Sequence, residues 1–272
     1  MPVKSLPCVL EPANLPPDLH EDYLDLLTEI LRPGQHILHV GCQDGDLTYS
    51  LCYQVAEHGS VVGINAPGQD IKLAEDNPRR KAYHNASFLH VPDLTKLPFK
   101  NDTFDIVYAC NIMAYLPPCF DHKTVLDFLK EMKRVAKPGG FVVSRDIGTQ
   151  HFFPIEDLDA LFMKTLLRAA GLYGWYGPLM PKLYKFAGYD IADPSTFTVT
   201  TTNSMRGPAM GDDHWAEEFV KKFASGTERR KQWMTVGIQE SFIDLFAEKL
   251  KRWDTLTHSW YVCMYTEITA QV

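Results

Sequence analysis

The residues best suited to ligand binding lie where a short apolar run ends in a turn that holds two glycines. Residues 37–40 form the run and include His39, and residues 41–45 (Gly-Cys-Gln-Asp-Gly) form the turn. A strand that turns through glycine into a helix presents backbone N–H groups to a ligand. Asn65 ends the next apolar run, where a nucleotide-binding α/β fold places a side chain against ribose hydroxyls. Taken alone, such a turn is also common as a simple link between a strand and a helix.

Apolar runs and helical patterns alternate through the first half of the chain. The runs occupy residues 37–40, 60–64, 87–91, 104–110 and 141–145, and the helical patterns occupy residues 47–56, 71–77 and 124–136. Lys137-Pro138-Gly139-Gly140 is expected to end the last of these helices. This alternation predicts an α/β fold with a parallel, doubly wound sheet.

The second half changes pattern after Asp146. Residues 156–187 are helical and rich in aromatic side chains, with breaks at two prolines, and further helices are expected at 215–223 and 239–253. Residues 196–202 and 261–269 complete a seven-stranded, mostly parallel sheet. We predict a single domain over residues 19–272, in which residues 150–195 and 205–255 contribute a helical lid. A helix at 19–31 follows an extended arm of residues 1–18, which contains five prolines.

Composition excludes several classes of function. The 272 residues are 45% hydrophobic and carry a net charge of -7, so a broad basic face for nucleic acid or anionic lipid is not expected. The six cysteines form no Cys-x-x-Cys pair, which favours a reducing compartment and argues against disulfides and a metal site. No apolar stretch is long enough for a membrane span. We expect a cytoplasmic protein, monomeric or homodimeric, that binds a small molecule.

Further motifs follow the glycine turn in a fixed order. They are Asp93-Leu94, Leu97-Pro98-Phe99, residues 104–107, Asn111-Ile112, residues 131–135, residues 137–140 and Arg145-Asp146. In this ordered set the sequence resembles the class I S-adenosylmethionine (SAM)-dependent methyltransferase superfamily, and within it the ubiquinone/menaquinone-biosynthesis type. It is most similar to fungal secondary-metabolite methyltransferases, in which an Arg-Glu or Arg-Asp pair ends the fifth strand. The resemblance covers residues 19 to 150 well and the rest by general plan.

The resemblance implies SAM as the cofactor and assigns residues to it. In such a fold the methionine part lies over the first turn, the ribose meets the residue that ends the second strand, and the adenine meets residues after the third. The fourth strand is followed by a residue that forms a wall of the site. The residues implicated in this way are His39, Gly41, Gln43, Gly45, Asn65, Asp93, Leu94 and Asn111.

Three of these positions depart from the family's pattern. The family usually has Asp or Glu in place of His39, Gly in place of Gln43 and an acidic residue in place of Asn65. Asn65 can still hydrogen-bond a ribose hydroxyl, but without the charge of a carboxylate. Gln43 adds a side chain where the backbone normally approaches the ligand. Together these changes predict weakened or altered cofactor binding.

The catalytic groups are less sharply indicated. Methyl transfer from a sulfonium depends on in-line positioning, and it needs a general base only if the acceptor must lose a proton. Tyr115, Asp146 and His151 are the candidates, because they follow the fourth and fifth strands, where similar enzymes hold the acceptor. Tyr115 is equally well explained as a hydrophobic wall. His151, as a histidine in a loop, is commonly a surface residue.

Three functions fit these observations. The first is SAM-dependent O- or C-methylation of a small, largely apolar metabolite, in secondary metabolism. The second is an enzyme on the same scaffold that no longer methylates and instead catalyses a cyclisation, a pericyclic step or an isomerisation, with SAM absent or unreactive. The third is a non-enzymatic subunit that accompanies an active methyltransferase.

Overall fold

The fold was analysed in a computed structural model. The structure describes residues 27–65, 71–113, 116, 122–161, 176–210, 215–221, 224–227, 230–231, 234 and 237–272. The predicted arm of residues 1–18 and most of the predicted helix at 19–31 lie outside these ranges.

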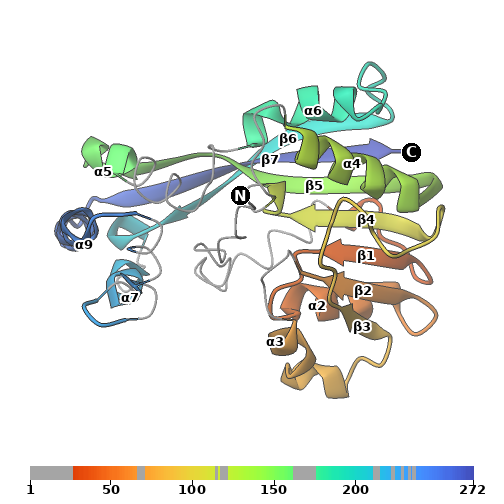
Figure 1. Cartoon of the computed structure of the whole chain (residues 1–272), viewed down its shortest axis with the longest axis horizontal. Coiled ribbons are helices and arrows are strands. Elements are labelled where there is room, and N and C mark those ends of the chain that lie inside the picture. Colours follow the sequence, from red (N-terminus) through yellow and green to blue (C-terminus); the bar gives the residue numbers. More distant parts are fainter. Residues whose placement is uncertain are drawn as a thin grey trace.

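A twisted sheet of seven strands forms the centre of the molecule (Figure 1). The strand order is β3-β2-β1-β4-β5-β7-β6, and β7 runs antiparallel to both of its neighbours. This confirms the predicted seven-stranded, mostly parallel sheet. The strands are β1 (His36–Val40), β2 (Ser60–Ile64), β3 (Ala86–Leu89), β4 (Phe104–Cys110), β5 (Ala136–Phe153), β6 (Phe197–Arg206) and β7 (Trp260–Gln271).

Helices cover both faces of the sheet, and each buries one apolar stripe. In α4 the buried residues, among them Val125, Phe128 and Met132, recur at intervals of three and four and therefore share one side of the helix. Together with α6 they pack on the face that carries Leu38 and Val107, whereas α2 packs on the opposite face. The helices are α2 (Asp46–Val55), α3 (Lys72–Glu75), α4 (Lys123–Val135), α5 (Glu156–Leu161), α6 (Met180–Phe186), α7 (Trp215–Lys221) and α9 (Glu240–Asp254), with 3₁₀ turns η2 (Pro78–Lys81), η5 (Gly177–Leu179) and η6 (Pro208–Met210).

A separate apolar cluster forms where β5 and β7 extend beyond the shorter strands. Phe152 of β5 and Tyr265 of β7 pack with α5 and α9 through Leu158, Ile243 and Trp253. Figure 1 shows α5, α7 and α9 gathered around this end of the long strands. The segments predicted to form a lid contain these helices, and their action as a lid stays a prediction.

The fifth strand is the main error in the predicted elements. The sequence predicts residues 141–145, but β5 runs from Ala136 to Phe153. Its second half is held by β7, as far as the pair Phe153 and Trp260. At its start, Lys137 to Gly140 form an irregularity in the pairing with β4 rather than a loop between helix and strand. Asp146 and His151, expected after the strand, therefore lie within it.

The described cysteines behave as small apolar residues. Cys42, Cys52, Cys110 and Cys263 are buried thiols. Burial raises the pKa of the Cys52 thiol to about 12, so this thiol stays protonated. Among the described helices, none has the length and apolar composition to cross a membrane.

Candidate cofactor and acceptor site

The turn after β1 is a tight structure built on left-handed residues. The backbone N–H groups of Gly41 and Cys42 donate to the Ile64 carbonyl at 2.7 and 3.1 Å, which ties the turn to the end of β2. Gly41, Gln43 and Gly45 have φ values of 89°, 49° and 85°. At Gly41 a Cβ atom would lie 2.7 Å from Ile112 Cδ1, so this position requires glycine. Gln43 adopts a left-handed conformation that costs a non-glycine residue about 1 kcal/mol.

Asn65 fixes the position of Gln43. Its Oδ1 accepts a hydrogen bond from the Gln43 backbone N–H at 2.7 Å, and its side chain is buried. One polar atom of Asn65 is thus engaged in shaping the turn. The sequence placed Asn65 beside the cofactor, and the structure adds that it braces the turn. Its contact with a ribose stays a prediction.

His39 lies beneath the turn. The ring is buried, its Nδ1 is 2.9 Å from Thr48 Oγ1 of α2, and it stacks on Tyr108 of β4 with 5.5 Å between ring centroids. These contacts give His39 a packing role between α2 and β4. Direct contact of His39 with the cofactor stays a prediction.

Asp93 and Leu94 form the turn after β3, and α4 holds this turn in place. Asp93 Oδ1 accepts from the Thr95 hydroxyl at 2.6 Å and from the Thr95 N–H at 2.9 Å, and the hydroxyl bond lowers the pKa of Asp93. Leu94 is buried in the core. Glu131 accepts from the Leu97 N–H at 2.8 Å, and Arg134 donates to the Leu97 carbonyl at 3.0 Å. The sequence analysis treated Glu131 and Arg134 only as part of a family motif. Their opposite charges, three residues apart on a helix, were the signal that could have indicated a paired role.

Asn111 and Asp146 meet at the carboxyl ends of β4 and β5. The Asn111 N–H donates to the Arg145 carbonyl at 2.7 Å, and Asp146 Oδ1 accepts from the Met113 N–H at 3.1 Å. The two side chains are 5% and 2% exposed. Both amide atoms of Asn111, and Oδ2 of Asp146, are buried without a hydrogen-bond partner. Burial raises the pKa of Asp146 to about 8.

Two glycines explain how Asp146 becomes buried. Asp146 pairs with Thr266 of β7, and Gly148 follows at an irregularity in the strand. A Cβ on Gly177 would lie 2.6 Å from Gly148 Cα and 2.8 Å from Thr266 Oγ1. Because neither residue has a side chain, η5 packs directly on β5 beside Asp146.

Arg145 serves the opposite face of the sheet from its neighbour Asp146. Its guanidinium is fully buried, with Nε 3.3 Å from Glu267 Oε1 and the Tyr265 ring centroid 4.2 Å from Cζ. The two residues therefore differ in role: Arg145 forms an internal ion pair, and Asp146 is a buried carboxyl at the end of β4. Sequence reasoning missed Glu267, whose signal was a charged residue within an apolar strand.

His151, the other catalytic candidate among the described residues, is not brought to Asp146. His151 contacts the carboxylate of Asp159 on the α5 side, and its ring meets the Trp260 ring at 5.7 Å. His151 lies five positions beyond Asp146 along β5, which corresponds to about 17 Å. Tyr115 lies outside the described residues. Within the described ranges, no three His, Cys, Asp or Glu side chains gather as a metal site.

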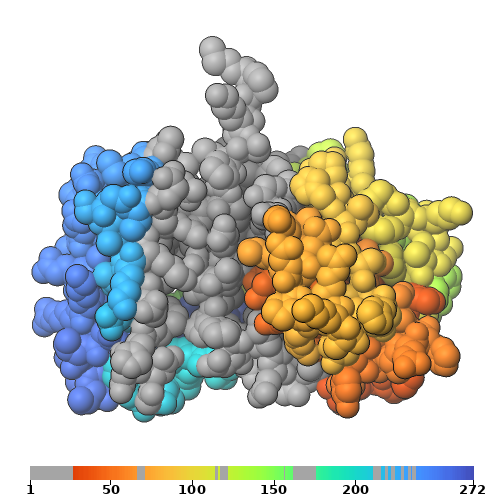
Figure 2. Space-filling view, turned by 90° about the horizontal axis from the view of Figure 1, so that it is seen from below, coloured from red at the N-terminus to blue at the C-terminus, as the bar shows by residue number. Residues whose placement is uncertain are grey.

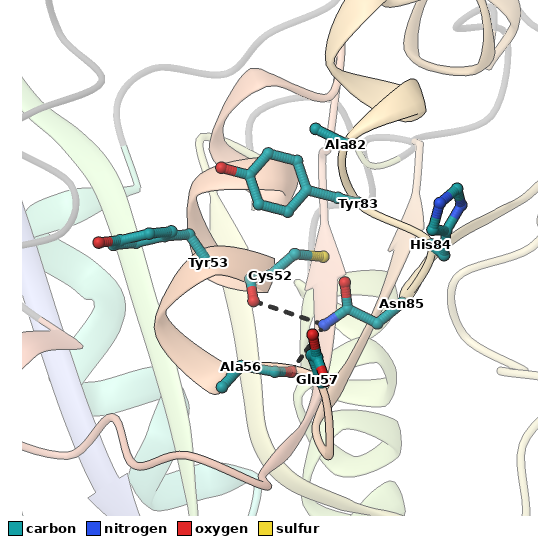
Figure 3. A pocket seen from close by; sticks show the side chains of 8 residues that line it. All are labelled: Cys52, Tyr53, Ala56, Glu57, Ala82, Tyr83, His84 and Asn85. Atoms are coloured by element: carbon teal, nitrogen blue, oxygen red, sulfur yellow. Dashed lines mark hydrogen bonds between the residues drawn. The ribbon is translucent and has the colours of Figure 1, made fainter.

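A surface hollow lies at the amino ends of the strands, away from Asn111 and Asp146. It is lined by residues 52–57 of α2 and its end, and by residues 82–85 before β3. Asn85 Nδ2 donates to the carbonyls of Cys52 and Ala56 at 3.4 and 2.9 Å, which caps the end of α2 (Figure 3). In the space-filling view, residues around α3 and η2 (orange) and residues of α7 and α9 (blue) occupy opposite ends of one face (Figure 2).

Comparisons with known proteins agree with this geometry. A family model described as a methyltransferase domain matches residues 31–171, just over half of the chain. An Aspergillus luteorubrus protein named "Probable methyltransferase ltbC" is 28% identical over 261 residues, which cover 90% of this chain and 88% of that protein. A demethylmenaquinone methyltransferase of Geobacillus stearothermophilus is 29% identical over 168 residues, covering 59% of this chain and 68% of the relative.

Solved structures share the fold. The [4+2]-cyclase SpnF superposes with a TM-score of 0.51 at 16% identity, covering 90% of this chain and 80% of that chain. YcgJ of Bacillus subtilis gives 0.58 at 16% identity, covering 93% and 97%. At these identities the likeness concerns the fold alone.

Proposed function

The chain belongs to the methyltransferase domain family, and we propose that it methylates a small, largely apolar metabolite at an oxygen or an activated carbon. S-adenosylmethionine is the cofactor of this family, and it supplies an electrophilic methyl group on a positively charged sulfur. One observation carries the proposal. The turn expected to hold the cofactor, after β1, and an open polar pair, after β4 and β5, lie at the same edge of the sheet. With β4 between β1 and β5, the two features are about 10 Å apart.

The residues after β1 fit the cofactor. Gly41 and Gly45 keep the turn tight, and Asn65 holds Gln43 in its left-handed conformation. We propose that Gly41, Gln43 and Gly45 meet the methionine part, that Asn65 meets the ribose, and that Asp93 and Leu94 border the adenine. His39 and Asn65 stand where the family usually has acidic residues, and we propose that affinity for the cofactor is correspondingly reduced.

Asp146 is the described residue best placed to assist the acceptor. It is buried, close to Asn111, and keeps one oxygen open to a ligand. Loss of a proton makes the acceptor atom a better nucleophile, and a hydrogen-bonding group near that atom stabilises the negative charge that develops. We assign this role to Asp146 and leave His151 out of the proposal, since it is held by Asp159.

We further propose a place in secondary metabolism, in the cytoplasm, and a single domain whose segments 150–195 and 205–255 close over the acceptor. The first point rests on the resemblance of the sequence motifs to fungal secondary-metabolite methyltransferases. The apolar and aromatic side chains packed near Asp146, such as Met113 and Tyr184, support an apolar acceptor.

Calorimetric titration of the purified chain with SAM and with S-adenosylhomocysteine tests the cofactor site. Micromolar binding of both, followed by products heavier by one methyl group in an acceptor screen, is the expected result. A well-folded chain that binds neither compound would contradict the proposal.

A second candidate is an enzyme of the same fold that rearranges its substrate without methylating it. The observation that favours it is the altered turn, where His39 packs internally and Asn65 is engaged with Gln43. Product of unchanged mass, formed equally well with and without added SAM, would identify this activity.

A further inference from the structure

Three hydrogen-bonding positions are open at the ends of β4 and β5. They are Oδ1 and Nδ2 of Asn111 and Oδ2 of Asp146, and all three atoms are buried. A buried polar atom without a partner costs about 1–3 kcal/mol. Two such side chains on adjacent strands therefore indicate a ligand that satisfies them.

Asp146 presents its open oxygen as a donor. Its Oδ1 already accepts the Met113 N–H. No ion pair reaches this carboxyl from the described residues, and the charged side chains of Arg145 and Glu267 pair on the other face of the sheet. Neighbours on its own face among the described residues include Thr266 of β7 and Tyr184 of α6, and the Tyr184 hydroxyl donates to Ser144.

An unpaired carboxylate is costly in such surroundings, so the neutral acid is the stable form and Oδ2 carries the proton. Burial also raises the pKa of Tyr184, so this neighbour stays neutral as well. The open positions are then two donors, Asn111 Nδ2 and Asp146 Oδ2–H, and one acceptor, Asn111 Oδ1.

We propose that Asn111 and Asp146 bind an acceptor molecule that carries a hydroxyl group and a carbonyl group, not hydrogen-bonded to each other, on an apolar body. The carbonyl oxygen, with two lone pairs, accepts from both donors, and the hydroxyl donates to Asn111 Oδ1. This inference deepens the proposed function by naming the substrate class.

Other ligands leave part of the site unsatisfied. An ammonium group has donors only, so Asn111 Nδ2 would keep no partner. A carboxylate would have to bury its charge beside Asp146, on which no described cation acts. The methionine end of the cofactor is a third occupant. Against it, the Asn111 N–H is bonded to the Arg145 carbonyl of β5, which draws Asn111 toward Asp146, while Ile112 packs over Gly41.

Binding of simple naphthalene compounds tests the inference on the full chain saturated with S-adenosylhomocysteine. The probes are 3-acetyl-1-naphthol, with both groups, 1-naphthol and 2-acetylnaphthalene, with one group each, and 1-naphthylmethylamine. We expect the compound with both groups to bind most tightly. 2-Acetylnaphthalene lacks one hydrogen bond and should bind about tenfold more weakly, and 1-naphthol lacks two and should bind more weakly still, because one net hydrogen bond is worth about tenfold. Tighter binding of the amine, or equal binding of all four, would overturn the inference.

Variants identify the residues that make the contacts. Asn111→Gly removes the amide but tolerates the φ of 51° found there, and Asp146→Asn keeps a donor at the open position. Asn111→Gly removes two of the three proposed hydrogen bonds, so we expect it to weaken binding of 3-acetyl-1-naphthol about tenfold or more; we expect Asp146→Asn to retain it. The matched control is Ser144→Ala, which removes a buried hydroxyl on the same face that already has a partner, and it should leave the affinity unchanged.

The readouts separate this inference from the proposed function. If Asn111→Gly weakens S-adenosylhomocysteine and not the probe, Asn111 belongs to the cofactor and the inference is wrong. If the native chain binds the probe without any affinity for S-adenosylhomocysteine, the methyltransferase proposal fails and the acceptor site stands. Native chain that binds S-adenosylhomocysteine and none of the probes would refute the inference alone.

Discussion

Replacement of Asp146 by asparagine tests the electrostatics of the site with almost no change of shape. The pKa of Asp146 is about 8 in the folded chain, against an ordinary value of 3.8. Between these values the folded state binds the proton and the unfolded state releases it, so the free energy of unfolding falls as pH rises. By pH 7 this effect lowers the free energy of unfolding, relative to its value at low pH, by at most about 4 kcal/mol. Asparagine accepts the Met113 N–H in the same way and carries no charge in either state.

Urea unfolding at about pH 5, 7 and 8.5 measures this effect. We expect the Asp146→Asn variant to be more stable than the native chain at neutral pH, with a gap that widens up to pH 8. Asp93→Asn is the control with the opposite sign, because the Thr95 hydroxyl lowers the pKa of Asp93, and that stability is lost on acidification. Parallel pH profiles for the native chain and Asp146→Asn would refute the assignment of a neutral, buried Asp146.

Four further substitutions test the site and its supports. Gly41→Ala, whose Cβ would press against Ile112, should weaken S-adenosylhomocysteine binding about tenfold or more, measured by calorimetry. Asn65→Ala should lower the free energy of unfolding by about 1–3 kcal/mol, because the Gln43 N–H loses its acceptor, whereas Asn65→Asp should not. His151→Ala, at a half-exposed ion pair, should change stability by less than about 1 kcal/mol and leave S-adenosylhomocysteine affinity unchanged. Glu267→Ala strands the buried Arg145 charge and should destabilise the chain by about 3–5 kcal/mol in urea unfolding.

The alternation of apolar runs and helices was sufficient to predict the sheet. β2 and β4 begin and end where the sequence predicts, at Ser60–Ile64 and Phe104–Cys110. Strands buried on both faces are continuous apolar runs with polar or glycine ends, so their limits are a local property. The glycine turn after β1 is local as well, because the left-handed backbone of Gly41 and Gly45 is a property of those residues.

The acceptor end of the site depended on contacts between distant segments. β5 continues to Phe153 because β7, more than a hundred residues later, pairs with it, and no local pattern contains that partner. The different roles of Arg145 and Asp146 follow from the same pairing, which turns one side chain to Glu267 and the other to Met113.

The sequence by itself determined the order of the elements and the turn for the cofactor, because strand propensity and glycine conformation act between near neighbours. Only the tertiary structure decided which polar side chains remain without a partner. Whether Asn111 and Asp146 are satisfied depends on every segment that packs around them, including Gly177 of η5 and Thr266 of β7. Hydrogen-bond satisfaction is a property of the whole packed chain, and it is what marks these two residues as the place for a ligand.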